Sequence, residues 1–228
     1  MTSAIRKRVL AEPRAAQKLS PRGELKRTQI LDAAAEVLAA RGFAGTMLSE
    51  IAERAGTQAG SLYYHFASRE DLIEEVLRRG VTLTMAHVRE ALEALPAQTS
   101  ARDRLAAAIR EHVRFQLDVS AYARASARST GQVPAEMRAR INREFRRYGV
   151  FLDELIVDAM AEGAIDPGVD RAALRMLLIG AANWTTEWFR PDGTSNVDEI
   201  ADLLVRLMLS GVAMPKAGRR LPKKSKVD

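Results

Sequence analysis

The sequence predicts an all-α fold, and three observations lead to that class. Alanine and leucine are abundant, proline occurs only eight times, and no run of alternating β-branched residues predicts a strand. Apolar residues recur instead at the spacing of one helix face along most of the chain. Because 47% of the residues are hydrophobic, the chain can bury a substantial core, which excludes disorder of the whole protein.

The first helix is predicted from Glu24 to Gly42. Apolar residues at i, i+4, i+7 and i+8 place four side chains on one face: Ile30, Ala34, Val37 and Leu38. Glycine is a frequent C-terminal stop because it adopts a positive φ angle at little cost, so Gly42 is expected to end this helix.

Two short helices with a sharp turn between them are predicted next. The second follows Thr46, whose hydroxyl is placed to cap it, and ends at Gly56, where a sharp turn needs a positive φ angle. The third spans Ala59–Phe66, with the Thr57 hydroxyl as its predicted cap. A scaffold helix, a positioning helix, a sharp turn and a recognition helix together form a helix-turn-helix, which predicts DNA binding.

The rest of the chain is predicted to form longer helices. Ser68 is placed to cap one that runs to about Leu95, where Pro96 ends it. Breaks rich in glycine and proline then separate four more, over residues 101–118, 134–162, 169–190 and 197–213. The segment 119–130 has the weakest helical pattern.

Charge is distributed unevenly along the chain. Residues 1–28 hold eight Lys and Arg against two Glu, and residues 215–228 hold six Lys and Arg against one Asp. The total is +6, so the remaining 186 residues carry −5. We expect a flexible basic arm over residues 1–23 and a basic disordered tail over residues 215–228, each suited to a polyanionic partner.

Several classes of protein are disfavoured by what the sequence lacks. There is no cysteine, which removes disulfides, thiolate nucleophiles and cysteine-based zinc sites. No apolar run approaches the roughly 20 residues that span a bilayer, and no apolar stretch follows the basic N-terminal cluster as in a signal peptide. We expect a cytoplasmic protein with no membrane partner, no metal and no cofactor.

Two stretches near the N-terminus carry a specific resemblance to a known family. The chain from Thr46 to Gly56 reads TMLSEIAERAG, and from Gly60 to Leu72 it reads GSLYYHFASREDL. Both are similar to the N-terminal signature of TetR-family repressors, and the likeness covers roughly residues 24–76.

The resemblance implies two domains and a mode of action. A three-helix helix-turn-helix DNA-binding domain would cover residues 24–84, and a helical-bundle domain for ligand binding and dimerisation would cover residues 85–214. The protein would be a homodimeric transcriptional repressor that binds palindromic double-stranded operator DNA and is released by a small-molecule effector. A dimer supplies two recognition helices about one DNA turn apart, which a monomer cannot do.

The same resemblance implies roles in DNA binding for individual residues. The implied set is Thr46, Ser49, Thr57, Gln58, Ala59, Gly60, Ser61, Tyr63, Tyr64, His65 and Arg69. Those near the start of the third helix would face base edges or nearby phosphates, whereas the two tyrosines, the histidine and the arginine would contact the DNA backbone. Tyr63 and Tyr64 could instead be packing residues, and His65 could cap the recognition helix.

A segment in the second half predicts where an effector binds. Trp184 and Trp188 are i, i+4 neighbours within a stretch similar to a tryptophan-rich segment of a TetR branch that senses acyl-CoA thioesters. They are predicted to line an effector pocket together with Phe115 and Phe151, and an acyl-CoA is the expected effector. The alternative is that the tryptophans fill the core or a subunit interface.

Two further features of the second half allow two readings each. The helices over residues 169–190 and 197–213 have broad apolar faces that suit a four-helix dimer interface or ordinary intrachain core. Five arginines suit either the phosphates of CoA or a solvated face. These are Arg124, Arg128, Arg143, Arg146 and Arg147.

Two other classes of function compete with a ligand-responsive repressor. An enzyme would need convergent acids, bases or nucleophiles, whereas the three histidines are scattered over positions 65, 87 and 112. His87 and His112 could meet around a metal with Glu90 or Glu111, but isolated surface histidines are the simpler expectation. An architectural DNA-binding protein would not need so large a C-terminal body, so neither alternative is preferred.

Overall fold

The computed structural model describes residues 20–212. The predicted basic tail and residues 1–19 of the predicted basic arm lie outside the described residues. Within the described range the chain forms nine α-helices, one π-helical turn and no strand, which confirms the all-α prediction. The α-helices are α1 (Pro21–Gly45), α2 (Leu48–Arg54), α3 (Ala59–His65), α4 (Arg69–Glu93), α5 (Ala101–Arg114), α6 (Ala121–Ser129), α7 (Ala135–Ala161), α8 (Arg171–Trp188) and α9 (Val197–Gly211), and the π-helical turn η1 is Phe115–Val119.

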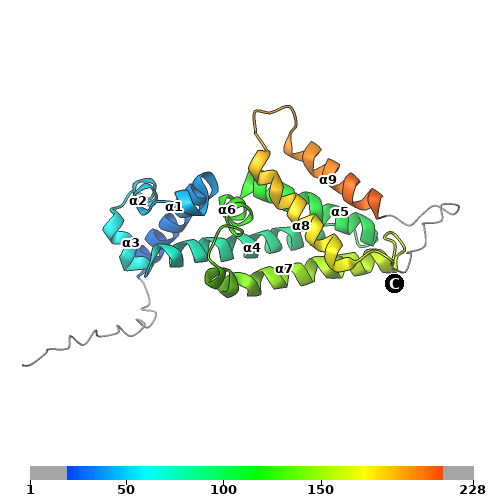
Figure 1. Cartoon of the computed structure of the whole chain (residues 1–228), viewed down its shortest axis with the longest axis horizontal. Helices are drawn as coiled ribbons and strands as arrows, with labels where there is room; N and C mark the ends of the chain where they lie inside the picture. The colour runs from blue at the N-terminus through cyan, green and yellow to red at the C-terminus, as the bar shows by residue number, and fades with distance from the viewer. Residues whose placement is uncertain (1–19, 213–228) are drawn as a thin grey trace, which may run out of the picture.

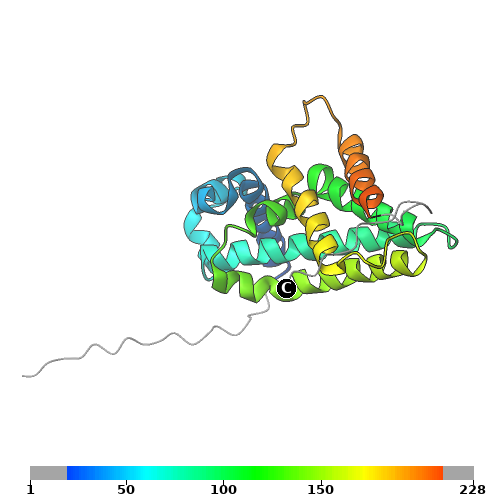
Figure 2. The ribbon, with the colours of Figure 1, turned by 45° about the vertical axis from the view of Figure 1, so that its right-hand side comes forward.

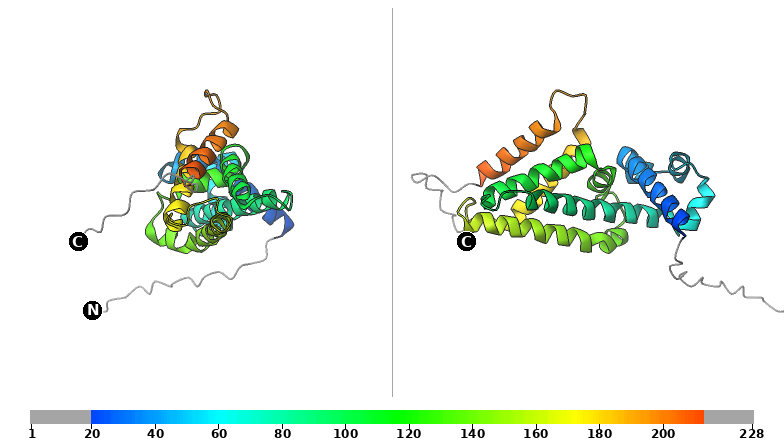
Figure 3. Two further views of the ribbon diagram at one scale, coloured as in Figure 1. Left: turned by 90° about the vertical axis from the view of Figure 1, so that its right-hand side faces the viewer. Right: turned by 180° about the vertical axis from the view of Figure 1, so that it is seen from behind.

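The molecule is elongated, with a small head at one end and a larger body at the other (Figure 1). Helices α1, α2 and α3 form the head, and the long α4 runs out of the head through the body, with α7 alongside it. Helix α8 crosses the body (Figure 2), and α9 packs on α5, as the view from behind also shows (Figure 3). In the part described, no helix combines the length and apolar character that crossing a membrane requires.

The ends of the first helices differ in detail from the prediction. Helix α1 begins at Pro21, three residues early, because the Ser20 hydroxyl accepts a hydrogen bond from Gly23 N at 3.3 Å and proline favours the first helical turn. The chain kinks at Gly42, where φ is 70°, and one more helical turn follows. Gly56 has the predicted positive φ angle, 58°.

Two predicted helix caps are wrong and one is confirmed. The residues at the start of α2 and α3 are Met47 and Gln58, and neither makes a side-chain capping bond, so Thr46 and Thr57 do not cap these helices. Ser68 caps α4 as predicted, because its hydroxyl accepts from Asp71 N at 3.0 Å.

Two apolar cores hold the fold together. The core of the head is built on α1 and α4 and includes Leu62 and Phe66 of the predicted recognition segment, which point inward as predicted. It also contains Ala125 of α6 and Met137 and Ile141 of α7. The head therefore packs directly against the body through α6 and α7, and the second core lies among α4, α5, α7, α8 and α9.

Candidate functional site

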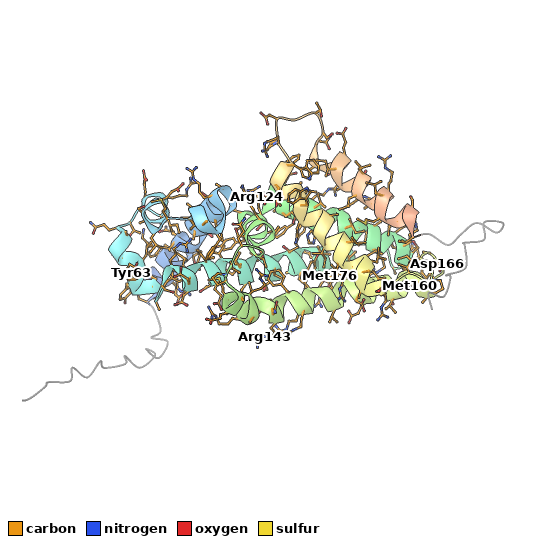
Figure 4. The ribbon with its side chains drawn as sticks, in the orientation of Figure 1. Tyr63, Arg124, Arg143, Met160, Asp166 and Met176 are labelled. Atoms are coloured by element: carbon orange, nitrogen blue, oxygen red, sulfur yellow. The ribbon has the colours of Figure 1, made fainter. Side chains whose placement is uncertain are left out.

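The outer end of the head presents α3 to solvent. Its apolar residue Leu62 is buried, whereas Tyr63 and Tyr64 are exposed, and Figure 4 shows Tyr63 at the tip of the head. The other exposed residues at this tip are Gln58, Ala59, Gly60 and Ser61, with Ser49 exposed on α2 nearby in sequence. Seven residues of the predicted DNA-contacting set therefore lie on the exposed surface of the helix-turn-helix. Thr57 is half-buried.

The turn between α2 and α3 is held from α1. Lys26 Nζ donates to the carbonyl oxygens of Ala55 at 2.8 Å and Gly56 at 3.1 Å. A cation at these carbonyls satisfies acceptors that the helix leaves free and complements the negative end of its dipole. From the sequence, Lys26 was assigned only to the basic N-terminal region. Its bonds to the turn could not be predicted, because they join residues about 30 positions apart.

The side chains of Thr46 and Arg69 make hydrogen bonds within the head. The Thr46 side chain is only 2% exposed, and its hydroxyl donates to Gly42 O at 2.7 Å. The Arg69 guanidinium donates to Thr46 O at 2.9 Å and to Phe43 O, and it stacks over the Phe43 ring. Both side chains thus hold the α1–α2 turn, a role that local sequence did not indicate.

His65 lies at the end of α3, against α1. Burial lowers its pKa, and the nearby positive charges of Arg27 and Lys26 lower it further. Its ring meets the edge of Tyr64, with 5.0 Å between ring centroids, and its Nδ1 has no hydrogen-bond partner among the described residues. The structure shows no bond by which His65 caps the described α3.

The body contains a cavity of about 50 Å³ among α4, α5, α6, α7 and α8. It is lined by Val81, Thr84, His112, Gln116, Ala123, Ser126, Ala127, Phe145, Tyr148, Ile179 and Asn183. The lining is mixed, with aromatic and aliphatic side chains beside hydroxyl, amide and imidazole groups.

Three of the side chains that line this cavity are joined by hydrogen bonds. His112 Nδ1 lies 2.6 Å from the Tyr148 hydroxyl, and His112 Nε2 lies 3.3 Å from Asn183 Oδ1. Burial lowers the pKa of His112 and raises the pKa of Tyr148, so both groups are neutral at pH 7. The expectation of a surface position for His112 was wrong, because partners 36 and 71 residues away enclose it.

Three of the four aromatic residues predicted to line an effector pocket lie outside this cavity. Phe115 is buried and stacks on His87 with 4.4 Å between centroids. Trp184 and Trp188 are 64% and 49% exposed on the outer face of α8. None of these lines the cavity, and the exposure of the tryptophans also rules out the reading that they fill the core of this chain.

The outer face of α8 and α9 carries further exposed apolar side chains. Met176 and Leu177 are exposed on α8, and Leu203 and Leu207 on α9; Met176 is visible on α8 in Figure 4. The opposite sides of both helices are buried in the body core. Each helix therefore has two apolar faces: one packs into the core of this chain, and the other is exposed.

The five arginines considered for phosphate binding separate into two groups. Arg124 donates to Leu117 O, and Arg128 donates to carbonyls of α1, so both are used within the fold. The other three, Arg143, Arg146 and Arg147, line an outer trough of about 590 Å³ between α4 and α7 together with Arg89. The Arg89 guanidinium lies over the Phe151 ring, 4.9 Å from its centroid, which places predicted pocket residue Phe151 in this trough.

The two histidines considered for a metal site are not brought together. His87 Nε2 lies 3.1 Å from Glu111 Oε2, whereas His112 binds Tyr148 and Asn183. Across residues 20–212 no group of three or more metal-ligating side chains is assembled.

Helix α6 joins the cavity to the head. One side of it contributes Ala123, Ser126 and Ala127 to the cavity lining. Other groups on α6 bond to α1, since the Tyr122 hydroxyl donates to Asp32 Oδ1 at 2.8 Å and Arg128 Nη1 donates to Ala39 O at 2.9 Å.

The loop after α6 adds a third link to α1. Gln132 Oε1 accepts a hydrogen bond from Phe43 N at 2.9 Å, next to the kink at Gly42. No local pattern in the sequence indicates this arrangement, because all three links join residues about 90 positions apart.

Two family models match the chain. The model of the bacterial regulatory proteins of the tetR family matches residues 30–76, and that of the tetracyclin repressor-like C-terminal domain matches residues 98–212. The first covers α2 and α3 with parts of α1 and α4, and the second covers the body from α5 to α9.

Several known proteins are similar over most of their length. The fatty acid metabolism regulator protein of Bacillus subtilis is 26% identical over 82% of this chain and 95% of its own. The transcriptional repressor KstR2 of Rhodococcus jostii is 29% identical over 83% of this chain and 92% of its own. These relatives are transcriptional regulators and not enzymes.

Solved structures agree with this likeness. AibR in complex with isovaleryl coenzyme A and operator DNA has a TM-score of 0.70 at 27% identity, over 80% of this chain and 97% of its own. FadR of Bacillus subtilis in complex with stearoyl-CoA has a TM-score of 0.67 at 26% identity, over 81% and 98%.

Proposed function

Because the chain belongs to the TetR family of bacterial regulatory proteins, we propose that it is a dimeric transcriptional repressor released from its operator by an acyl-CoA. The observation that carries the proposal is the exposed face of α3, which joins small and polar side chains at the outer end of the head. The acyl-CoA part draws its support from the relatives whose structures hold acyl-CoA.

The head suits the major groove of DNA. Ala59 and Gly60 at the start of α3 are exposed and small, so the helix can enter a groove about 12 Å wide. Gln58 and Ser61 flank them and supply hydrogen-bonding groups for base edges. Tyr63 and Tyr64 follow, with hydroxyls suited to phosphates. Thr46 and Arg69 are left out of this contact set because both hold the α1–α2 turn.

The outer face of α8 and α9 is proposed as the dimer interface. Isolated exposed apolar residues are normal, but two helices that together expose Trp184, Trp188, Leu203 and Leu207 are not. Two copies of this helix pair would form a four-helix interface between symmetry-related subunits. This reading also gives the two tryptophans a role, since aromatic residues are enriched at the centres of interfaces.

The body offers complementary places for the two ends of an acyl-CoA. The cavity takes the acyl group, and the arginine-lined trough takes the phosphates through Arg89, Arg146 and Arg147. The stacked rings of Tyr148 and Phe151, 6.2 Å apart, join the cavity lining to the trough lining.

Release follows from the position of α6. A ligand that enlarges the cavity displaces α6, and the bonds from Tyr122, Arg128 and Gln132 carry that displacement to α1. A ligand shifts the DNA-binding equilibrium only by its differential affinity for the two head positions. A coupling of about 1–3 kcal/mol would change DNA affinity roughly 5–150-fold.

Selection from a pool of random duplexes tests the operator claim. We expect enrichment of an inverted repeat with half-sites separated by about one DNA turn or a multiple of it. Native mass spectrometry of the selected complex should show an even number of protomers per duplex. Failure to enrich any sequence, or a single protomer on the selected duplex, would refute a dimeric operator-binding protein.

A further inference from the structure

We propose that the cavity recognises a neutral hydrogen-bonding group, a hydroxyl or a ketone, on the acyl part of the effector, and that Ser126 is the residue that selects it. This inference rests on the proposed function and adds to it the chemical class of the acyl group. It is carried by one unpartnered buried hydroxyl and by the polar groups that surround it.

Ser126 occupies an unusual position. The residue is 4% exposed and lines the cavity, and its Oγ has no hydrogen-bond partner in the described part of the chain. Buried polar groups are nearly always paired, since an unpaired hydroxyl loses its bonds to water and gains none. A ligand group that enters the cavity can supply the missing bond, because the Ser126 hydroxyl both donates and accepts.

The neighbouring polar groups leave further capacity for a ligand. Neutral His112 carries one ring proton, and the network is satisfied when Nε2–H donates to Asn183 Oδ1 and the Tyr148 hydroxyl donates to Nδ1. The side-chain N–H groups of Asn183 can then donate to a ligand, and the Tyr148 oxygen can accept from one. A ketone can accept from an N–H or from Ser126, and a hydroxyl can do either.

The charge of the lining excludes an anionic acyl group. No Lys, Arg, Asp or Glu is among the residues that line the cavity. Burial lowers the pKa of His112, so its imidazole offers no positive charge at pH 7. A carboxylate placed here would be buried without a counter-ion, which is far more costly than burying a neutral polar group.

The size of the cavity limits what it accepts as it stands. At about 50 Å³ it is much smaller than an engineered cavity of roughly 150 Å³ that binds benzene. The end of a short acyl chain is therefore the natural occupant, and a larger group must separate α4 from α6. These two helices meet at Gly80, where an added Cβ would lie 2.6 Å from Ser126 Cβ.

Four acyl-CoAs of equal chain length test the inference. Isothermal titration of the full chain would compare butyryl-CoA, 3-hydroxybutyryl-CoA, acetoacetyl-CoA and succinyl-CoA, which present an apolar, two neutral polar and one charged acyl group. We expect the tighter of the two neutral polar ligands to bind about tenfold more tightly than butyryl-CoA, as one additional satisfied hydrogen bond provides. Succinyl-CoA should bind most weakly.

A matched pair of variants assigns the preference to one residue. Ser126→Ala should bring the neutral polar ligands to the affinity of butyryl-CoA and leave butyryl-CoA binding unchanged. Ser129→Ala is the control, because Ser129 is also a buried, unpartnered serine of α6 but does not line the cavity. It should keep the preference of the original protein.

The outcomes separate the two proposals. Suppose that acyl-CoAs bind the protein and cause it to release DNA. If butyryl-CoA then binds as tightly as the polar ligands, or if Ser126→Ala keeps the preference, the inference is overturned, whereas the proposed repressor function stands. If none of the four ligands binds, the inference is overturned, whereas operator binding is judged by duplex selection alone.

Discussion

Gly80 of α4 and Ser126 of α6 lie at a crossing where no side chain fits between the helices. A Cβ at position 80 would come within 2.6 Å of Ser126 Cβ, and closer still to the Tyr122 carbonyl oxygen. Helix α4 joins the head to the body, and α6 lines the cavity. A movement of α6 caused by a ligand in the cavity would therefore act directly on α4 at this contact.

Replacing Gly80 should force this crossing apart. Gly80→Ala is expected to lower the free energy of unfolding by about 1–3 kcal/mol, because backbone and Cβ atoms must move to admit the methyl group. Denaturant unfolding measures the change. Gly149→Ala is the matched control in the long helix α7, where the nearest atom to an added Cβ is 3.8 Å away. That change should stabilise slightly, since alanine favours helix over glycine; equal effects of the two would contradict the close crossing.

A charge on the outer face of α8 and α9 should dissociate the dimer. Leu207→Asp buries an unpaired carboxylate if this face is the interface, so the sedimentation coefficient should fall to that of a monomer. Val119→Asp changes another exposed apolar residue that belongs to neither helix and should leave the dimer intact. A Leu207→Asp protein that stays dimeric would place the interface elsewhere.

Much of the fold could be predicted from the sequence because its helices are long and strongly periodic. The segment 119–130 was the exception, since its helix depends on Ser120 as a cap and on packing of Ala125 into the head core. The positive φ angle of Gly56 was predicted correctly, because a sharp turn between two helices needs a residue with positive φ and glycine adopts that conformation without steric strain.

The candidate sites were predicted unequally, for a physical reason. The exposed residues of α3 follow from local periodicity, which separates Leu62 from its solvent-facing neighbours. The cavity depends on partners far apart in the sequence, such as His112 and Asn183, so no local pattern could reveal it. The exposure of Trp184 likewise depends on which face of α8 meets the body, and both faces are apolar.

Reversing the charge of the outer trough should weaken CoA binding. The double variant Arg89→Glu with Arg147→Glu removes two cations and adds two anions where phosphates are proposed to lie. Binding of free CoA should weaken by at least about tenfold, and the salt dependence of binding should flatten. Arg78→Glu is the control, an exposed arginine of the same helix α4 outside the trough. Unchanged CoA affinity in the double variant would exclude the trough.

Acidification should destabilise the fold through His112. Its pKa is lowered by burial in the folded protein and returns to about 6.5 on unfolding, so below that pH the unfolded chain binds more protons. The stabilising contribution is present above about pH 6.5 and is lost as the pH falls toward the folded value, at no more than about 1.4 kcal/mol per pH unit.

Denaturant unfolding between pH 7.5 and 5.5 measures this loss. His112→Gln should reduce the dependence on pH, even if it lowers stability at every pH through its lost bonds. His65→Gln should also reduce it, because burial lowers the pKa of His65 as well. His87→Gln is a comparison at a half-buried histidine. If His112→Gln leaves the slope unchanged, His112 is not buried in the neutral form.

Fluorescence anisotropy of the selected operator and of a scrambled duplex tests the central claim that α3 reads DNA. Tyr64→Ala should weaken binding to both duplexes by the same factor, as loss of a phosphate contact does, whereas Gln58→Ala should change the ratio between them. Val119→Ala, at an exposed residue outside the head, should match the original protein in both affinities. If Tyr64→Ala and Gln58→Ala bind both duplexes as tightly as the original protein, α3 does not contact DNA and the proposed function is contradicted.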